Sequence, residues 1–246
     1  MKGIIRANTF SETTFPLIRT RNMGVEVEEY QWTNDLTDAR AIFAKNAAKL
    51  EGVNVTSLHG TCLSRDFAVI RRMTRYEKCR AYNVSFAMAE LHGTRRLVFH
   101  SDYFASMIEP EAWVEQTAGL FSDYLRDKPA NLQVFLENFI DDTPELLKRV
   151  VAAVGDPRFG ICLDTGHANC NSPIPLNDWI TTLGDCIRHV HLHNNDGSRD
   201  WHWPLNRGTL DFRTVLPLLS QCASASDWVL ECDLPQSLDW LKANQM

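Results

Sequence analysis

Short apolar runs alternate with longer amphipathic segments along the whole chain. Continuous or alternating apolar runs predict strands over residues 3–10, 25–32, 53–60, 95–102, 132–139, 161–163, 190–192 and 228–233. Helical periodicity predicts helices over residues 15–24, 38–52, 66–91, 111–126, 143–154, 178–185, 212–222 and 237–244. Strand–helix alternation indicates a parallel sheet with right-handed crossovers, and eight units of about 30 residues favour a closed (β/α)8 TIM barrel.

Local signals place several helix ends within this pattern. We expect Gly24 and Gly52 to end the first two helices. Pro110 suits a helix start, and Thr143 followed by Pro144 is typical of a capped first turn. No glycine-rich phosphate-binding fingerprint follows the first strand, which argues against an open doubly wound sheet. We therefore expect an α/β protein with a single barrel domain over residues 1–246.

Composition narrows the class of protein. The chain has 246 residues, of which 44% are hydrophobic and 23% charged, which suits a globular enzyme with a sizeable core. Its net charge of −6 argues against a broad nucleic-acid-binding surface. Seven cysteines without CxxC spacing indicate reduced thiols. No apolar run approaches the roughly 18 residues of a transmembrane helix, and the first residues do not resemble a signal peptide, so we expect a cytoplasmic protein.

Polar side chains that can bind a metal ion gather at the predicted carboxyl ends of strands three to eight, where TIM barrels carry their chemistry. The set comprises His59, His100, Glu137, Asp164, His167, His191, Asp200, His202 and Glu231. Crowding so many buried carboxylates and imidazoles would be unfavourable without cations. Their oxygen and nitrogen ligands suit a divalent ion such as zinc, manganese, cobalt or magnesium. We expect one ion, with room for up to three.

The seventh strand leaves a choice among histidines. His189, His191 and His193 share one face of the strand by two-residue alternation. Position near the strand end favours His191, whereas His189 is expected deeper in the barrel and His193 in the loop or behind the ligands. Asp200 and His202, two residues apart, can face one ion together if their loop is extended.

Three weaker features each allow two interpretations. A basic stretch after His59 would either guide a phosphate-bearing substrate or form a solvated helix face, and the second is the commoner outcome; it contains Arg65, Arg71, Arg72, Arg75, Lys78 and Arg80. Trp201 and Trp203 would form an apolar wall against a sugar or pack at the rim. Glu26 and Glu28 alternate on the second strand, and we expect them to be structural.

Four motifs carry a resemblance to a known family. They are LEN at 136–138, CLDTGHA at 162–168, HLHNNDG at 191–197 and DWHWPLNRGTLDF at 200–212. With them the chain resembles the xylose isomerase-like TIM-barrel superfamily, which groups sugar isomerases and epimerases with endonuclease IV. The last motif is similar to the family's D-x-H-x-P-L-G-x-G-x-I-D-F loop, with Asn206 at a usual glycine position.

The resemblance implies two alternative ligand sets. In the isomerase and epimerase branch one metal ion is held by two Glu, an Asp and a His, which would be Glu137, Asp164, His191 and Glu231 here. In the endonuclease branch three ions use nine residues, and this chain offers a candidate for each in the set given above. Epimerases of the tagatose type carry an arginine in the loop after the seventh strand. Arg199 and Arg207 lie in this loop, but in a different register.

We expect an enzyme, and the first hypothesis is a metal-dependent isomerase or epimerase of a ketose-like sugar, a cyclitol or a related hydroxy-carbonyl compound. Glu137 and Glu231 would carry protons to and from the carbon next to the carbonyl, and His167 and His202 would orient hydroxyls or relay protons. The candidate substrate-binding residues are His59, His100, His167, His202, Trp201, Trp203 and Arg207.

Two other hypotheses stay open. A hydrolase with two or three metal ions would cleave a phosphodiester or another polar bond with a metal-activated water, and His59, His100, Asp200 and His202 motivate it. A barrel without catalytic activity would use the pocket for ligand sensing. The expected partner is a small molecule rather than nucleic acid or a membrane, and since barrels of this size often dimerise, a homodimer is considered.

Overall fold

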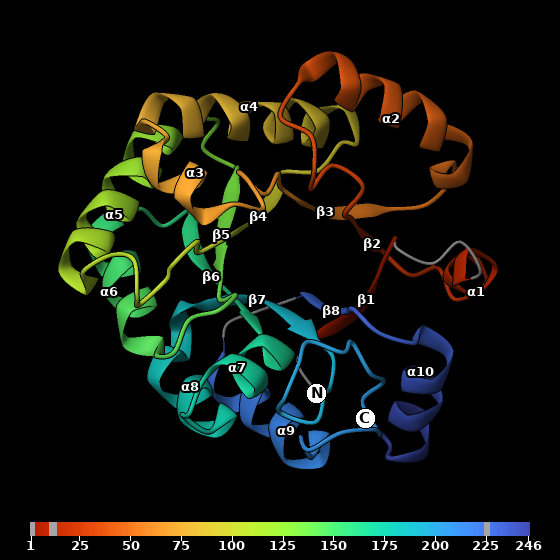
Figure 1. The fold of residues 1–246 in the computed structure, drawn as a ribbon. Coiled ribbons are helices and arrows are strands. Elements are labelled where there is room, and N and C mark those ends of the chain that lie inside the picture. Colours follow the sequence, from red (N-terminus) through yellow and green to blue (C-terminus); the bar gives the residue numbers. More distant parts are fainter. Residues whose placement is uncertain (1–2, 10–13, 224–226) are drawn as a thin grey trace.

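Eight parallel strands close into a barrel, each paired with the next along the chain and the last with the first (Figure 1). The computed structural model describes residues 3–9, 14–223 and 227–246. The strands are β1 (Ile4–Asn8), β2 (Val25–Val27), β3 (Val55–His59), β4 (Arg96–His100), β5 (Gln133–Glu137), β6 (Phe159–Asp164), β7 (Ile187–Leu192) and β8 (Asp227–Leu230). The (β/α)8 architecture expected from the alternation is confirmed.

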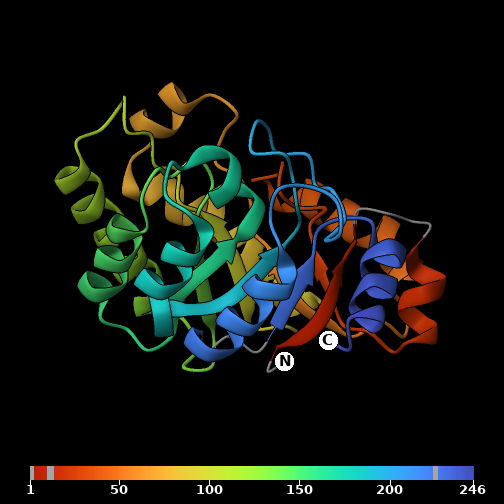
Figure 2. The same ribbon diagram turned by 90° about the horizontal axis from the view of Figure 1, so that it is seen from below.

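Helices surround this barrel on its outside (Figure 1). They are α1 (Phe15–Thr20), α2 (Leu36–Leu50), α3 (Phe67–Arg72), α4 (Arg75–Leu91), α5 (Pro110–Arg126), α6 (Pro144–Val154), α7 (Thr165–Asn171), α8 (Leu176–Leu183), α9 (Phe212–Cys222) and α10 (Leu234–Ala243), with a 3₁₀ turn at Gly184–Cys186. In the side view, both termini lie at one end of the barrel, and α3 and the loop after β7 lie at the other (Figure 2). Among the described residues, no helix has both the length and the apolar character that crossing a bilayer requires.

The long helix expected over residues 66–91 is wrong, because the chain breaks it into α3 and α4. Thr74 adopts an extended conformation and caps α4: its hydroxyl accepts the backbone N–H of Glu77, and the Glu77 carboxylate accepts the backbone N–H of Thr74. This capping box satisfies N–H groups that a continuous helix would have paired with the preceding turn. The break therefore divides most of the basic residues after His59 between α3 and the start of α4, with a bend between the two helices.

Other boundaries differ in detail. The first helix ends at Thr20, and the left-handed residue behind it is Asn22 (φ 50°) rather than Gly24. Gly52 does take a left-handed conformation (φ 72°) just after α2, as expected. The second strand is limited to Val25–Val27, because the chain turns directly after it. Helix α7 was not predicted; the Asp164 side chain caps it by accepting the backbone N–H of His167 at 2.7 Å.

The alternation of side chains along each strand divides the core into two parts. On β5, Leu136 joins the large apolar cluster between strands and helices. Its neighbour Phe135 points into the barrel, where it forms a small separate cluster with Val98 and Cys162. Above this plug the interior is polar, because Glu137 continues the inward-facing series of β5 at the carboxyl end.

Replacing Leu136, which is 0% exposed, with alanine removes contacts on the helix-facing side of the barrel. We expect Leu136→Ala to lower the free energy of unfolding by about 2–5 kcal/mol, because the rigid barrel closes a cavity poorly. Leu91→Ala, at a 50% exposed position, is the control and should change it by less than about 0.5 kcal/mol. Urea unfolding followed by circular dichroism measures both, and equal losses would contradict this division of the core.

Candidate active site

The nine residues singled out at the strand ends all lie at the carboxyl end of the barrel. Seven of them lie at or directly next to strand ends. His59, His100, Glu137 and Asp164 are the last residues of their strands, and His191 is the next-to-last residue of β7. Glu231 directly follows β8, and His167 lies in α7. Asp200 and His202 reach the same place from the loop after β7. Glu137, Asp164 and His191 are at most 1% exposed. The strands therefore bring together side chains from positions far apart in the sequence.

The His191 ring is the centre of this arrangement. Its Nδ1 atom lies 3.1 Å from Oε1 of Glu137, 3.0 Å from Oε1 of Glu231 and 3.8 Å from Oδ2 of Asp164. One N–H cannot satisfy three carboxylates, and Oε1 of Glu231 is buried without a hydrogen-bond partner in the described part of the chain. Three carboxylate oxygens and one imidazole nitrogen converging on one point form a donor set that fits a divalent ion.

The two glutamates of this set differ in charge preference. Burial opposes ionisation of Glu137, but the imidazoles of His191 and His100 outweigh it and hold its pKa well below the ordinary value. Burial raises the pKa of Glu231 well above its ordinary value, and the neighbouring carboxylate of Glu28 adds to this shift. These opposite shifts make Glu137 the more acidic of the two glutamates when no cation is bound.

Glu26, which the sequence analysis assigned to structure, contacts the central ring of the site. Its Oε1 atom lies 2.8 Å from Nε2 of His191 in an ion-pair contact that is not aligned as a hydrogen bond. Its Oε2 atom accepts a hydrogen bond of 2.9 Å from Nε2 of His189. Glu26 therefore holds the far side of the His191 ring and orients Nδ1 toward the mouth. A carboxylate between Val25 and Val27, both buried, was the signal in the sequence.

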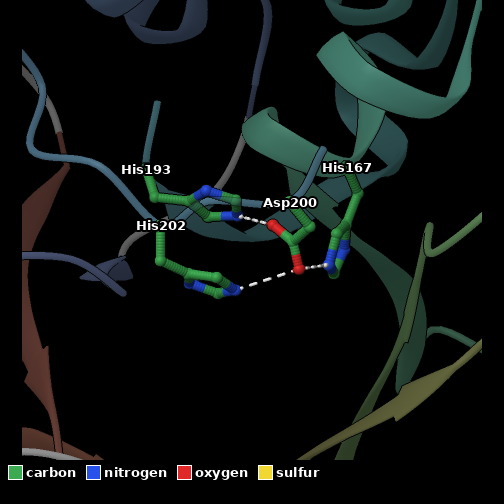
Figure 3. Close-up of side chains that lie close together, drawn as sticks. All are labelled: His167, His193, Asp200 and His202. Carbon is green, nitrogen blue, oxygen red and sulfur yellow. Dashed lines mark hydrogen bonds and ion pairs between the residues drawn. The ribbon is translucent and has the colours of Figure 1, made fainter. Parts of the chain in front are cut away.

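A second cluster joins His167 from α7, His193 directly after β7, and Asp200 and His202 from the loop that follows (Figure 3). Oδ2 of Asp200 lies 3.3 Å from Nε2 of His167 and 3.1 Å from Nε2 of His202. Oδ1 of Asp200 lies 3.6 Å from Nε2 of His193, whose ring stacks on His202 with 4.0 Å between centroids. Nε2 of His193 also lies 3.0 Å from Oδ1 of Asp164. His193, expected in the loop or behind the ligands, therefore shares this cluster.

In this cluster the negative charge of Asp200 and the positive charge of His202 stabilise each other. Burial opposes ionisation of Asp200, but hydrogen bonds with His167 and His202 hold its pKa well below the ordinary value. Burial opposes the charged form of His202, but its hydrogen bond with Asp200 prevails and raises its pKa to about 9. His202 also adopts a left-handed backbone (φ 48°), which is uncommon for this residue type and typical of functional sites.

A third group consists of Glu137 and the two histidines next to its second carboxylate oxygen, Oε2. Oε2 of Glu137 accepts a hydrogen bond of 3.0 Å from Nε2 of His59 and lies 3.6 Å from Nε2 of His100. The His100 ring stacks on Phe139 with 4.6 Å between centroids. The hydrogen bond from His59 thus orients the Glu137 carboxylate. Among the described residues, these three groups contain sets whose ligand atoms lie within 4.8 Å of one another, close enough to share an ion.

Asparagine side chains fasten the backbone that carries these groups. The Asn138 amide donates to the backbone oxygen of Asp164 at 3.0 Å and accepts from its nitrogen at 2.8 Å, which ties the end of β5 to the end of β6. The Asn194 amide donates to the backbone oxygens of Leu205 (3.2 Å) and Leu210 (3.0 Å). The loop that carries the second cluster is therefore anchored at both of its ends.

The mouth cavity, of about 310 Å³, is lined by some members of each group: Glu137 and Glu231 of the first, His167, Asp200 and His202 of the second, and His59 and His100 of the third. His191, Asp164 and His193 are not part of this lining, and an aromatic residue from outside the three groups is. Trp32 lines it, with the guanidinium of Arg65 4.2 Å from the centre of its ring. The stacked rings of Trp201 and Trp203 and the nearby Arg207 lie on the loop after β7, outside this lining. A substrate-contacting role for those three stays a prediction.

The position of Glu26 behind His191 generates a test. We expect Glu26→Gln to weaken binding of zinc or manganese by about 10–100-fold, because the ring loses the carboxylate that orients it and raises its basicity. Isothermal titration of metal-stripped protein measures the affinity. Glu111→Gln, on the outer helix α5, is the control. Unchanged affinity in Glu26→Gln would show that Glu26 is structural only.

Similar proteins are known. Over 80 residues, 32% of this chain, the sequence is 35% identical to the uncharacterized protein MJ1311 of Methanocaldococcus jannaschii, and the match spans only 27% of that relative. The TTHB071 protein from Thermus thermophilus, in a structure obtained by soaking with ZnCl2, has a TM-score of 0.70 and 26% identity, covering 99% of this chain and 97% of that one.

A D-tagatose 3-epimerase-like protein has the same fold, with a TM-score of 0.69 and 16% identity over 100% of this chain and 96% of that one. Residues 21–244 match the family described as xylose isomerase-like TIM barrel. This match covers nearly the whole barrel, from the residues just before β2 to the end of α10. The chain therefore belongs to the xylose isomerase-like TIM-barrel family.

Proposed function

We propose that this protein is a metal-dependent isomerase or epimerase of a ketose-like sugar, a cyclitol or a related hydroxy-carbonyl compound. The observation that carries the proposal is the approach of Glu137 and Glu231 to one nitrogen of His191, at 3.1 and 3.0 Å. The two glutamates come from β5 and from the residue after β8, so they reach this point from different sides of the mouth. Two carboxylates on different sides of a bound carbon can take a proton from one face and return one to the other.

Glu137, Asp164, His191 and Glu231 would hold the ion. Their converging oxygen and nitrogen atoms and the unpaired Oε1 atom of Glu231 support this assignment. A divalent ion bound there would act as a Lewis acid on the carbonyl and hydroxyl oxygens of a substrate. The ligand set leaves its identity open among zinc, manganese, cobalt and magnesium.

The protein's own residues would supply the proton transfers. Glu137, the more acidic of the two glutamates, would take the proton next to the carbonyl, and Glu231 would return one. His167 and His202 would orient substrate hydroxyls. Their Nδ1 atoms donate to the backbone oxygens of Asn138 (2.9 Å) and Glu231 (2.7 Å), which fixes both rings at the mouth.

The similarities to known proteins support the proposal at the level of the family. One structural neighbour is named for its likeness to a sugar epimerase, and another was soaked with a zinc salt. The family description itself refers to xylose isomerase. A small-molecule substrate follows from this proposal, and its identity depends on the loops around the mouth.

The second cluster favours an alternative, a hydrolase with two or three metal ions. His167, His193, Asp200 and His202 have ligand atoms close enough to share an ion, and a one-metal isomerase does not require that. His59 and His100 beside Glu137 offer a third place. In this alternative a metal-activated water would attack a phosphodiester or another polar bond.

The number of ions separates the two functions. Under the isomerase proposal, exhaustively dialysed protein should keep one tightly bound ion per chain after loading with zinc or manganese, and Asp200→Asn should keep the same number. Elemental analysis against protein concentration measures this. Two or three ions in the unaltered protein, with one lost in Asp200→Asn, would favour the hydrolase.

Removing the proton carriers tests the mechanism directly. Glu137→Gln and Glu231→Gln should each lower the rate at least 100-fold at saturating metal, because each loses a charge and a proton carrier. The assay is a panel of ketoses and cyclitols followed by NMR of the carbon-bound proton in D2O. Circular dichroism confirms folding, and Glu111→Gln is the matched control. Losses of tenfold or less in both variants would refute the roles given to the two glutamates.

A further inference from the structure

A second cavity lies beside the barrel mouth, lined by residues from α3, α4, α5 and the segment that follows β4. Its volume is about 230 Å³. A single water molecule needs only roughly 10–15 Å³ by the same kind of measure. The cavity is therefore large enough for a small organic molecule. His100 and Asp102 line both this cavity and the mouth cavity, so the two adjoin.

The walls of this second cavity are aromatic and aliphatic. Tyr82 comes from α4, and Trp113, Leu120 and Phe121 come from α5; each is at most 6% exposed. The Tyr82 and Phe121 rings stack with 5.9 Å between centroids. Apolar walls with a few polar groups are the usual composition of a small-molecule site.

The polar groups at the second cavity are mainly cationic. Lys78 is half-buried, and its ammonium group has no ion pair in the described part of the chain; burial lowers its pKa. Arg71, at the outer edge, likewise forms no ion pair with any described residue. Arg75 lines the cavity too, but its Nη1 atom is paired with Oδ2 of Asp123 at 2.8 Å. Within the described residues, two cationic side chains therefore face one cavity without an ion-pair partner.

Asp102 limits what can bind beside them. Asp102 also lines this cavity. Burial raises the pKa of its carboxyl group to about 7, and the positive charge of nearby Lys78 partly opposes this shift. The Asp102 backbone is left-handed (φ 51°), a conformation that costs energy for most residues other than glycine and persists where the surroundings enforce it. Cationic groups and one carboxyl group, whose oxygens can accept hydrogen bonds, thus line the same cavity as the apolar side chains.

We propose that the second cavity binds a small organic anion with a ring or a short aliphatic body. Its carboxylate or phosphate group would lie against Lys78 and Arg71, its body against Trp113 and Phe121, and any hydroxyl would donate to Asp102. A cation is disfavoured because two unpaired positive side chains outnumber the single carboxylate. The whole chain is acidic, with a net charge of −6, so this local excess of positive charge is not a consequence of composition. The site does not depend on the function proposed for the mouth.

Binding of simple probes tests this inference. Phenyl phosphate and benzoate carry the two kinds of anionic group, benzyl alcohol is the neutral match, and inorganic phosphate and acetate lack the ring. Isothermal titration is performed on zinc-loaded and on metal-stripped protein. We expect at least one of the two aromatic anions to bind at least tenfold more tightly than its neutral or ringless counterpart. Its affinity should be the same for the zinc-loaded and the metal-stripped protein. Whether phenyl phosphate or benzoate binds more tightly identifies the anionic group that the cavity prefers.

Variants locate the bound probe. Lys78→Met should weaken binding at least tenfold and Lys78→Arg should restore it. Thr117→Phe, which places a ring in the cavity from a lining position on α5, should abolish binding without loss of the folded state. Lys148→Met, on the outer surface of α6, is the matched control. The proposal would be overturned if no probe binds. It would also be overturned if binding needs zinc and is unaffected by Lys78→Met and Thr117→Phe.

Discussion

The contacts of the His191 ring are the interaction on which the rest of the site depends. Glu26 holds one nitrogen from β2, while Glu137 and Glu231 approach the other from β5 and the end of β8. Three carboxylates around one buried imidazole would repel one another in a low-dielectric interior. Their close approach is tolerated because the closed sheet and its helical shell hold the strand ends rigidly. A divalent cation would relieve this repulsion, which links the stability of the barrel mouth to its chemistry.

The loop after β7 depends on a different kind of constraint. It has no regular strand or helix between β7 and α9 apart from the bridge between Asn194 and Trp203, so side-chain amides must satisfy its backbone. The Asn194 and Asn195 amides fill this need, the latter by donating to the backbone oxygen of Gly166 at 2.8 Å. An added Cβ at Gly166 would come within 1.9 Å of the His193 ring, so only glycine permits this approach. These hydrogen bonds, together with the packing of Leu205 into the main apolar cluster, hold the second cluster in place.

The two cavities beside each other have opposite charge character. The mouth collects carboxylates and imidazoles, which suits cations and the oxygen-rich molecules that cations bind. The cavity beneath α3 and α4 presents Lys78 and Arg71 above apolar walls. Between them stands His100, packed flat against Phe139 and in contact with Glu137. His100 thus separates the proposed metal site at the mouth from the anion site proposed for the second cavity.

Periodicity and strand-end position were enough to determine the barrel and to place Glu137, Asp164 and His191 at its mouth. The reason is that two-residue alternation decides which side chains face inward, and parallel strands all end at one edge. The same signals could not show that Glu26 contacts His191, or that His193 joins Asp200. Those contacts join strands and loops far apart in the chain, and their distances are set by the closure of the barrel and the path of the loop. Only the tertiary structure decided them, because alternation gives the direction of a side chain and not what it meets.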